Sequence, residues 1–221
     1  MTTHRPILST NEFYHIFNRT IANQPIFDNI SNLKKIIRIV DYYQYKQKIK
    51  LSKFYSLPNR IKNEYREEAH EKLPLVEIFS FAFMPNHYHF LLRQLQDKGI
   101  ARFISDVQNS FAKNFNLVND RNGSLFQSGF KSRRIAYEED FYHISRYIHL
   151  NPVTSNIIKF NELLDYPYTS LSMYSNTNLN KFINVEYLLN HFKNLNSYIE
   201  FLENQVEYQQ KLKRIKDLLL D

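Results

Sequence analysis

Two histidines lie two residues apart in an otherwise apolar stretch, FAFMPNHYHFLL, which spans residues 81–92. Residues two apart on a β-strand point to the same face of the sheet, so His87 and His89 would project together while Tyr88 points away. Neighbouring imidazoles in an apolar setting are costly if either carries a charge alone. A shared divalent metal would keep both rings neutral and give them a common partner. Because two core histidines with local hydrogen bonds fit the same short pattern, the pair alone does not establish a metal site.

The sequence around the two histidines predicts a β-hairpin. Residues 75–83, LVEIFSFAF, have the composition of a buried strand. Pro85 fixes φ and Asn86 tolerates unusual backbone angles, so the segment MPN predicts a turn. Residues 87–94, HYHFLLRQ, then return as the next strand. The hairpin would therefore present both imidazoles on one face of a sheet.

The other segments alternate between strand and helix patterns. The sequence predicts, in order, a strand within residues 12–27, a helix in 29–46 with Ser31 as its N-cap, a charged helical insertion at about 46–73, the hairpin, a helix at 99–118, a loop and strand in 121–135, and a helix in 137–150. This order is typical of an α+β sandwich with a mainly antiparallel sheet. We expect one main domain at residues 9–175 and a helical tail at 176–221 that serves packing or dimerisation.

Two of these segments have a clear pattern of buried positions. In the first strand, Phe13, His15 and Phe17 alternate with Tyr14 and Ile16, as in a strand that is covered on both faces. In the helix at 99–118, one apolar stripe is formed by Ile100, Phe103, Ile104, Val107 and Phe111.

The overall composition favours a basic protein that works in a reducing compartment. With 29 Lys and Arg against 22 Asp and Glu, the formal net charge is +7, which favours a polyanionic partner such as nucleic acid, although a solvated basic surface would give the same total. The absence of cysteine excludes disulfides and thiolate metal sites. No signal-peptide pattern and no apolar run long enough for a bilayer is present. We therefore expect a soluble, cytoplasmic protein without a membrane partner.

Five short segments, spread in order over most of the chain, form a more specific pattern. They are FYHIFNRTIANQPIF at 13–27, MPNHYHFLL at 84–92, GSLFQSGFKS at 123–132, YIHLNPV at 147–153 and LLDYPYTSLSMY at 163–174. The second resembles the HUH signature (His, hydrophobic residue, His) of single-tyrosine transposases. Together the five resemble the REP-associated tyrosine transposases of that superfamily, with their YHV-x-x-RG, G-x-LWQ-x-RF, YI-x-x-NPV and DYPWSS motifs. The resemblance implies the HUH transposase fold, a ferredoxin-like sandwich, here with a C-terminal helical extension.

The resemblance also implies a reaction and the residues that perform it. HUH enzymes of this kind cut single-stranded DNA with a tyrosine, which leaves a 5′-phosphotyrosine and a free 3′-hydroxyl. The matching nucleophile is Tyr147, and the third metal ligand beside His87 and His89 is Asn151. Residues four apart share a helix face, and we expect Pro152 to end the helix so that Asn151 lies at its terminus.

Several neighbours of the proposed nucleophile are alternatives to it. The chain has 16 tyrosines, so composition alone cannot select Tyr147 over Tyr137 or Tyr142. His143 lies one turn before Tyr147 and is either a group that orients or deprotonates it or a plain surface histidine. The implied cofactor is a divalent metal ion, Mg²⁺ or Mn²⁺; two imidazoles and an amide suit Mn²⁺ well, whereas Mg²⁺ prefers oxygen ligands.

The implied partner is single-stranded or hairpin DNA, bound by a monomer or a homodimer. Each candidate DNA-binding residue has a structural alternative. The basic residues could form a solvated strand edge instead of contacting DNA. Phe126 is either a packing or a stacking residue, and Gln127 either reads a base or braces its loop. The candidate DNA-binding residues are Arg19, Phe126, Gln127, Lys131, Arg133 and Arg134.

The sequence thus predicts a metal-dependent DNA endonuclease and strand-transferase of the transposase type. Two alternatives remain. One is a non-catalytic module, derived from such an enzyme, that binds hairpin DNA or RNA. The other is an unrelated metallohydrolase with a water nucleophile, which would need an acid or base beside the metal.

Overall fold

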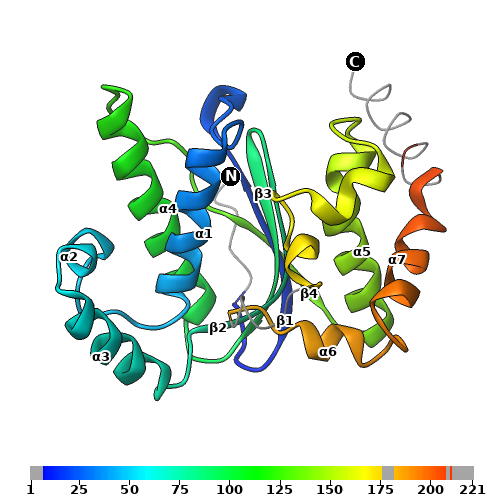
Figure 1. Cartoon of the computed structure of the whole chain (residues 1–221), viewed down its shortest axis with the longest axis horizontal. Coiled ribbons are helices and arrows are strands. Elements are labelled where there is room, and N and C mark those ends of the chain that lie inside the picture. The colour runs from blue at the N-terminus through cyan, green and yellow to red at the C-terminus, as the bar shows by residue number, and fades with distance from the viewer. Residues whose placement is uncertain (1–6, 176–181, 208–209, 211–221) are drawn as a thin grey trace.

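The structure, a computed structural model, describes residues 7–175, 182–207 and 210 (Figure 1). Its strands are β1 (Phe13–Arg19), β2 (Val76–Met84), β3 (His87–Gln94) and β4 (Lys131–Ile135). Its α-helices are α1 (Ile30–Tyr43), α2 (Leu51–Tyr55), α3 (Asn59–His70), α4 (Gly99–Val118), α5 (Glu138–Thr154), α6 (Val185–Leu189) and α7 (Leu195–Glu203). Three short 3₁₀ helices are η1 (Ile21–Asn23), η2 (Phe160–Asp165) and η3 (Ser170–Met173).

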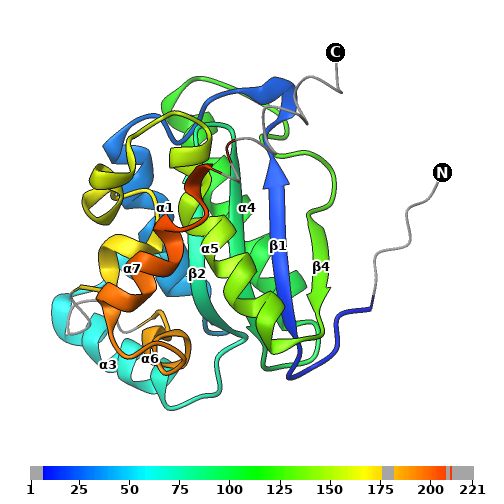
Figure 2. The ribbon, with the colours of Figure 1, turned by 90° about the vertical axis from the view of Figure 1, so that its right-hand side faces the viewer.

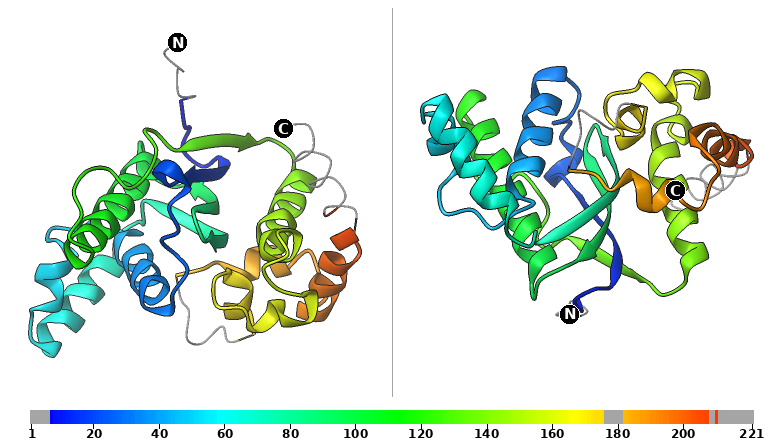
Figure 3. Two further views of the ribbon diagram at one scale, coloured as in Figure 1. Left: turned by 90° about the horizontal axis from the view of Figure 1, so that it is seen from above. Right: turned by 60° about the horizontal axis from the view of Figure 1, so that its bottom comes forward.

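The four strands form one antiparallel sheet in the order β2–β3–β1–β4. The chain builds it as β1–α1–β2–β3–α4–β4, which is the ferredoxin-like arrangement. Helices α1 and α4 cover one face of this sheet, and α5 and α7 lie on the other side (Figure 3). The predicted α+β sandwich, with an antiparallel sheet flanked by helices, is confirmed.

Strand register decides which side chains share a face of the sheet. In β1 and β3, His15 lies opposite Leu91, Phe17 opposite His89, and Arg19 opposite His87. Directly paired residues point to the same side, so these side chains share the face on which α5 lies (Figure 2). The other face is mainly apolar. Its buried apolar residues on the two strands are Tyr14, Ile16, Tyr88, Phe90 and Leu92, and Asn18 and Gln94 are its buried polar residues.

The long helix α4 confirms the predicted stripe, because Ile100, Phe103, Ile104, Val107 and Phe111 are all buried in it. Its first residue, Gly99, lies against the chain just before β2. A Cβ atom at this position would lie 2.2 Å from the carbonyl oxygen of Leu75, so a side chain here would push the helix away from the sheet.

Two predicted details of helix ends are wrong. The N-cap of α1 is Asn29, whose side chain accepts a hydrogen bond from the amide of Asn32, and Ser31 lies inside the helix. Helix α5 does not end before Pro152 but continues to Thr154. Proline removes a single backbone donor, and the turn still closes because the amide of Ser155 donates to the Asn151 oxygen at 3.0 Å. Asn151 therefore lies inside the last turn of α5.

The charged insertion predicted at about 46–73 contains α2 and α3. The described part of the predicted tail, residues 182–207, contains α6 and α7. Ile183 forms a parallel bridge with Ile78 of β2, and the guanidinium of Arg146 on α5 lies 4.1 Å from the ring centre of Phe201 on α7. The division of the chain at residue 175 stays a prediction. No helix in the described part of the chain is both long and apolar enough to cross a bilayer.

Candidate active site

Three histidines, not two, lie together on the face of the sheet beneath α5. The ring centres of His87 and His89 are 5.2 Å apart. His15, from the neighbouring strand β1, stacks on His89 at 5.1 Å. Its Nε2 atom is 2.9 Å from Nδ1 of His89, a hydrogen-bonding distance. In the sequence, His15 is only one position of an alternating strand that is covered on both faces, and its place in that pattern predicts no role at the site. The pairing of β1 with β3 brings it next to His89.

Hydrogen bonds set the donor and acceptor roles of these ring nitrogens. His87 Nδ1 lies 2.7 Å from the carboxamide oxygen of Asn86, and because that oxygen can only accept, Nδ1 donates this bond; in the neutral ring the lone pair then lies on Nε2. Burial, with a smaller effect from the charge of Arg133, lowers the pKa of His15 to about 4. His15 is therefore neutral at pH 7, when it can accept a hydrogen bond from His89.

Helix α5 brings Tyr147 to the histidines. The centre of its ring lies 5.6 Å from that of His89 and 5.9 Å from that of His15, edge-on to both. The side chain is 40% exposed, so its ring packs against the imidazoles while part of it stays open to a large ligand. The structure thus brings together the tyrosine and the histidine pair that the sequence singled out.

The surroundings of Tyr147 shift the pKa of its phenol in opposite directions. Burial raises the pKa of the phenol above its usual value, whereas a hydrogen bond from the Asn151 side chain and the positive charge of Arg19 lower it. The net shift is upward, so the phenol is protonated at neutral pH. Asn151 and, to a smaller extent, Arg19 are the groups that favour its ionised form.

Asn151 lies one turn after Tyr147 and is only 4% exposed. Its amide nitrogen donates to the backbone oxygen of Tyr147 at 2.9 Å. This bond holds the carboxamide in place and leaves its oxygen as the atom suited to a hard cation. A role for Asn151 as a metal ligand stays a prediction.

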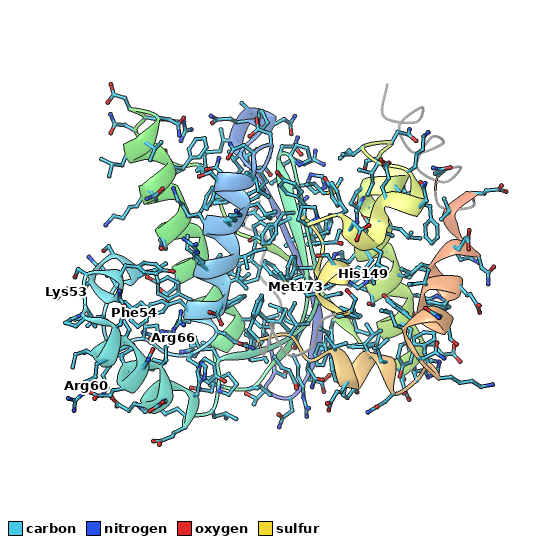
Figure 4. The ribbon with its side chains drawn as sticks, viewed as in Figure 1. Lys53, Phe54, Arg60, Arg66, His149 and Met173 are labelled. Atoms are coloured by element: carbon cyan, nitrogen blue, oxygen red, sulfur yellow. The ribbon has the colours of Figure 1, made fainter. Side chains whose placement is uncertain are left out.

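A buried hydrogen-bond network holds α5 against the rest of the protein. His149, labelled in Figure 4, uses Nε2 for the Ser170 hydroxyl and Nδ1 for the Tyr198 hydroxyl, both at 2.7 Å. The same hydroxyl of Tyr198 lies 2.8 Å from that of Ser145. Burial lowers the pKa of His149 to about 3, so the ring is neutral. These bonds fix the side of α5 that faces away from the histidine cluster.

The predicted basic residues divide between the two faces. Register places Arg19 beside His87, Lys131 beside Phe17 and Arg133 beside His15, all on the histidine face. Arg134 points to the other face and forms an ion pair with Glu12 at 2.9 Å.

Phe126 and Gln127 lie side by side in the loop before β4 but differ in exposure. Phe126 is 8% exposed and packs against Tyr88 and Phe111, which makes it a core residue in this structure. Gln127 is exposed, and its backbone amide donates to the Arg19 oxygen at 2.9 Å. The loop is therefore fastened to the end of β1.

The three other candidates near Tyr147 are Tyr137, Tyr142 and His143, and their surroundings differ from those of Tyr147. Tyr142 donates to Glu138 at 2.9 Å and stacks on His191, and Tyr137 is 74% exposed. His143 accepts a hydrogen bond from Arg146 at 2.7 Å. Neither of these two hydrogen bonds involves Tyr147. A role for His143 in orienting or deprotonating Tyr147 stays a prediction.

The donor set fits a divalent cation of the Mg²⁺ or Mn²⁺ type. His87 offers a lone pair at Nε2, His89 can offer one when it donates to His15, and Asn151 offers an oxygen. Among the residues that the structure describes, no three side chains of the types His, Cys, Asp and Glu are arranged so that they could hold a metal ion together. The proposed site therefore depends on the amide oxygen of Asn151 as its third ligand, and the metallohydrolase alternative stays a hypothesis.

The fold and site define a ferredoxin-like domain whose central strands present histidines to a tyrosine on a helix that crosses the sheet. A solved structure of a REP-associated tyrosine transposase bound to a REP hairpin matches 84% of this chain and 90% of its own length, with a TM-score of 0.54 and 13% identity. The chain has the fold of that transposase.

Two further solved structures show weaker similarity. A candidate transposase from Deinococcus radiodurans matches 67% of this chain and 95% of its own length, with a TM-score of 0.37 and 14% identity. The tRNA(His) guanylyltransferase of Saccharomyces cerevisiae matches 93% and 82%, with a TM-score of 0.33 and 11% identity. A scan against protein-family models gave no match, and neither did a search of curated proteins.

Proposed function

We propose that this chain is a metal-dependent, single-tyrosine endonuclease and strand-transferase of the HUH transposase superfamily, which acts on single-stranded DNA beside a hairpin. The observation that carries the proposal is the position of the Tyr147 ring, edge-on to His89 and His15. The hairpin bound to the transposase of the same fold supports the choice of substrate.

The proposed reaction exchanges one phosphodiester for another. The phenol oxygen of Tyr147 loses its proton and forms a bond to phosphorus, while the bond from phosphorus to the 3′ oxygen breaks and that oxygen takes up a proton. The products are a 5′-phosphotyrosine and a free 3′-hydroxyl. Because the phosphate stays esterified, a second 3′-hydroxyl can displace the tyrosine and join two strands.

The residues around Tyr147 have distinct roles in this proposal. His87, His89 and Asn151 would hold a Mg²⁺ or Mn²⁺ ion, which supplies positive charge that polarises the scissile phosphate. His15 would accept a hydrogen bond from the Nδ1–H group of His89, so that the lone pair of a neutral His89 lies on Nε2. Arg19 favours the phenolate and attracts the phosphate.

A covalent adduct provides the test. The wild-type chain is incubated with Mn²⁺ and a pool of labelled DNA hairpins with randomised single-stranded flanks, and protein–DNA adducts are separated on denaturing gels. We expect an adduct that EDTA prevents and that is absent in Tyr147→Phe. The matched control is Tyr137→Phe, since Tyr137 is an exposed tyrosine that lies at the start of the same helix, ten residues before Tyr147. An undiminished adduct in Tyr147→Phe would refute this nucleophile.

The same experiment separates catalysis from binding alone. Salt-dependent binding of hairpins by the wild-type chain, with no adduct under any metal condition, would favour the non-catalytic DNA- or RNA-binding module.

A further inference from the structure

Helix α5 carries Tyr147 on one side and two buried polar side chains on the opposite side. Ser145 and His149 are both fully buried, and each lies two residues from Tyr147. Two residues of an α-helix correspond to a rotation of about 200°, so both side chains point away from the tyrosine. Because Ser145 and His149 are four residues apart, they share one face of the helix. Contacts that fix this face therefore also fix the direction of Tyr147.

Hydrogen bonds connect this face of α5 to α7. The hydroxyl of Tyr198, on α7, lies 2.7 Å from Nδ1 of His149 and 2.8 Å from the hydroxyl of Ser145. Tyr198 is fully buried, and α7 lies on the side of α5 that is farther from the sheet (Figure 1). A single phenol thus contacts both polar residues of the face, and it belongs to the segment that the sequence predicts as a tail, residues 176–221.

Hydrogen bonds connect the same face of α5 to the sheet. Nε2 of His149 lies 2.7 Å from the hydroxyl of Ser170. That hydroxyl also accepts a hydrogen bond from the backbone amide of Phe81, on β2, at 2.9 Å. The next residue of β2, Ala82, pairs with His89 in the sheet register. The network therefore ties α5 to the sheet one residue away from the position that pairs with His89.

The network adds direction to the packing of α5. Buried apolar residues such as Ile148 and Leu150 also hold the helix in place, but apolar attraction has no preferred direction. Hydrogen bonds weaken steeply when their distance or angle changes. The neutral ring of His149 offers one donor and one acceptor, and each of the two hydroxyls beside it can be the complementary partner. These bonds therefore favour one rotation of α5 about its axis.

The proposed reaction depends strongly on that rotation. The tip of a helical side chain lies about 5–6 Å from the helix axis, so a rotation of about 10° moves it by about 1 Å. A misplacement of a reacting group by about 1 Å can cost about 100-fold in rate. The Tyr147 ring lies edge-on to His89 and His15, with ring centres 5.6 and 5.9 Å apart, and a rotation of α5 would change both contacts.

We infer that His149 is a positioning residue for Tyr147, and that α7 belongs to the catalytic unit because Tyr198 completes the network. His149 acts only through α5 and touches neither the metal nor the DNA. The effect on rate rests on the proposed function. The position of the Tyr147 ring can be measured without any reaction.

Two matched substitutions each remove one buried phenolic hydroxyl. Tyr198→Phe keeps the ring and removes the bonds to His149 and Ser145. The control is Tyr42→Phe on α1, which lies on the opposite side of the sheet (Figure 3). It removes a bond of similar length, 2.8 Å, to the backbone oxygen of Ile49. Both substitutions leave buried polar groups without a partner, so both should lower the melting temperature.

The rate of adduct formation is measured in single turnovers at saturating hairpin DNA and Mn²⁺, at a temperature at which every variant is folded. We expect Tyr198→Phe to form the adduct about 10 to 100 times more slowly than the wild type. Its affinity for hairpin DNA in EDTA and the Mn²⁺ concentration for half-maximal rate should stay within about two-fold, since the network is separate from the metal ligands. Tyr42→Phe should keep the wild-type rate within about three-fold.

A second pair of variants changes the imidazole itself. His149→Leu removes both bonds of the ring. His149→Asn places an amide nitrogen near the position of Nδ1 and so can keep the bond to Tyr198. We expect the rate to fall most in His149→Leu and to recover in part in His149→Asn. A role in apolar packing alone would favour leucine over asparagine and give the opposite order.

Nuclear Overhauser contacts between the ring protons of Tyr147 and those of His15 and His89 report the position of Tyr147 without metal or DNA. They are identified as the tyrosine–histidine contacts that are missing in Tyr147→Phe. We expect these contacts in the wild type and in Tyr42→Phe, and weaker contacts in Tyr198→Phe and His149→Leu.

The inference is wrong if Tyr198→Phe keeps either the wild-type rate or the wild-type ring contacts, or if Tyr42→Phe slows the reaction as much. Failure of the proposed function gives a different pattern. If the wild type forms no adduct but the ring contacts weaken as expected, the proposed function fails and the positioning of Tyr147 by the network stands. If the wild type forms the adduct and the ring contacts do not change, only the positioning role fails.

Discussion

On the face of β1 and β3 that α1 and α4 cover, Tyr14, Ile16 and Phe90 are at most 1% exposed. On the face beneath α5, the same two strands carry His15, His87 and His89. Because alternate residues of a strand point to opposite sides, residues that are adjacent in sequence have different roles. One face supplies the apolar contacts that stabilise the fold, and the other supplies groups with lone pairs and charge. Substitutions at adjacent positions should therefore have separable effects, on stability for one face and on activity for the other.

The largest expected effect is on the polar face. His89→Ala removes a proposed metal ligand and the partner of both His15 and Tyr147. Loss of metal polarisation costs several kcal/mol, which is about a thousand-fold in the rate of adduct formation. The rate is measured in single-turnover assays with hairpin DNA and Mn²⁺. A melting temperature close to that of the wild type would show that the fold survives; a rate within ten-fold of the wild type would contradict the role of His89.

Substitution of Phe90, the residue next to His89, should have the reverse effect: a loss of stability with activity retained. The ring is fully buried on the apolar face, against Phe83 and Phe103. Phe90→Ala leaves a cavity and should lower the free energy of unfolding by about 3–5 kcal/mol, measured by urea denaturation. Under conditions in which the variant is fully folded, its rate of adduct formation should stay near that of the wild type. A stable but inactive Phe90→Ala would show that the two faces are not independent.

The difference between the faces also explains what the sequence could and could not reveal. The hairpin and the apolar stripe of α4 follow from local periodicity, and both are confirmed. The contact of His15 with His89 joins residues 74 positions apart, and periodicity carries no information about which strands pair. The expected end of α5 at Pro152 rested on a local rule, but one missing donor near a helix end is too small a cost to stop a helix packed on a sheet. Tyr147 was identified from the family resemblance, since 16 tyrosines offer no local distinction.

A smaller effect is expected at His15, which touches the proposed metal ligand but is not one itself. His15→Phe keeps a ring of similar shape beside Phe17 and removes the acceptor for His89. Loss of such a supporting hydrogen bond typically costs 10–100-fold in metal affinity or activity. The readout is the Mn²⁺ concentration needed for half-maximal adduct formation, which should rise. His15→Gln, which restores a polar group at a similar reach, should recover part of the loss; equal behaviour of the two variants would indicate a packing role alone.

The smallest expected effect compares Arg133 and Arg134, adjacent residues on opposite faces of β4. Arg133 lies opposite His15 on the site face, and within the described part of the chain no carboxylate forms an ion pair with it. Arg134 is 58% exposed and already paired with Glu12. Arg133→Ala should weaken hairpin binding a few-fold and reduce the salt slope by about 1, as for one phosphate contact. Arg134→Ala removes the same charge but should leave both quantities nearly unchanged, since an exposed ion pair contributes about 1 kcal/mol or less to stability. Identical salt slopes for the two variants would show that only total charge matters at this edge, and the distinction between the faces would then not extend to DNA binding by β4.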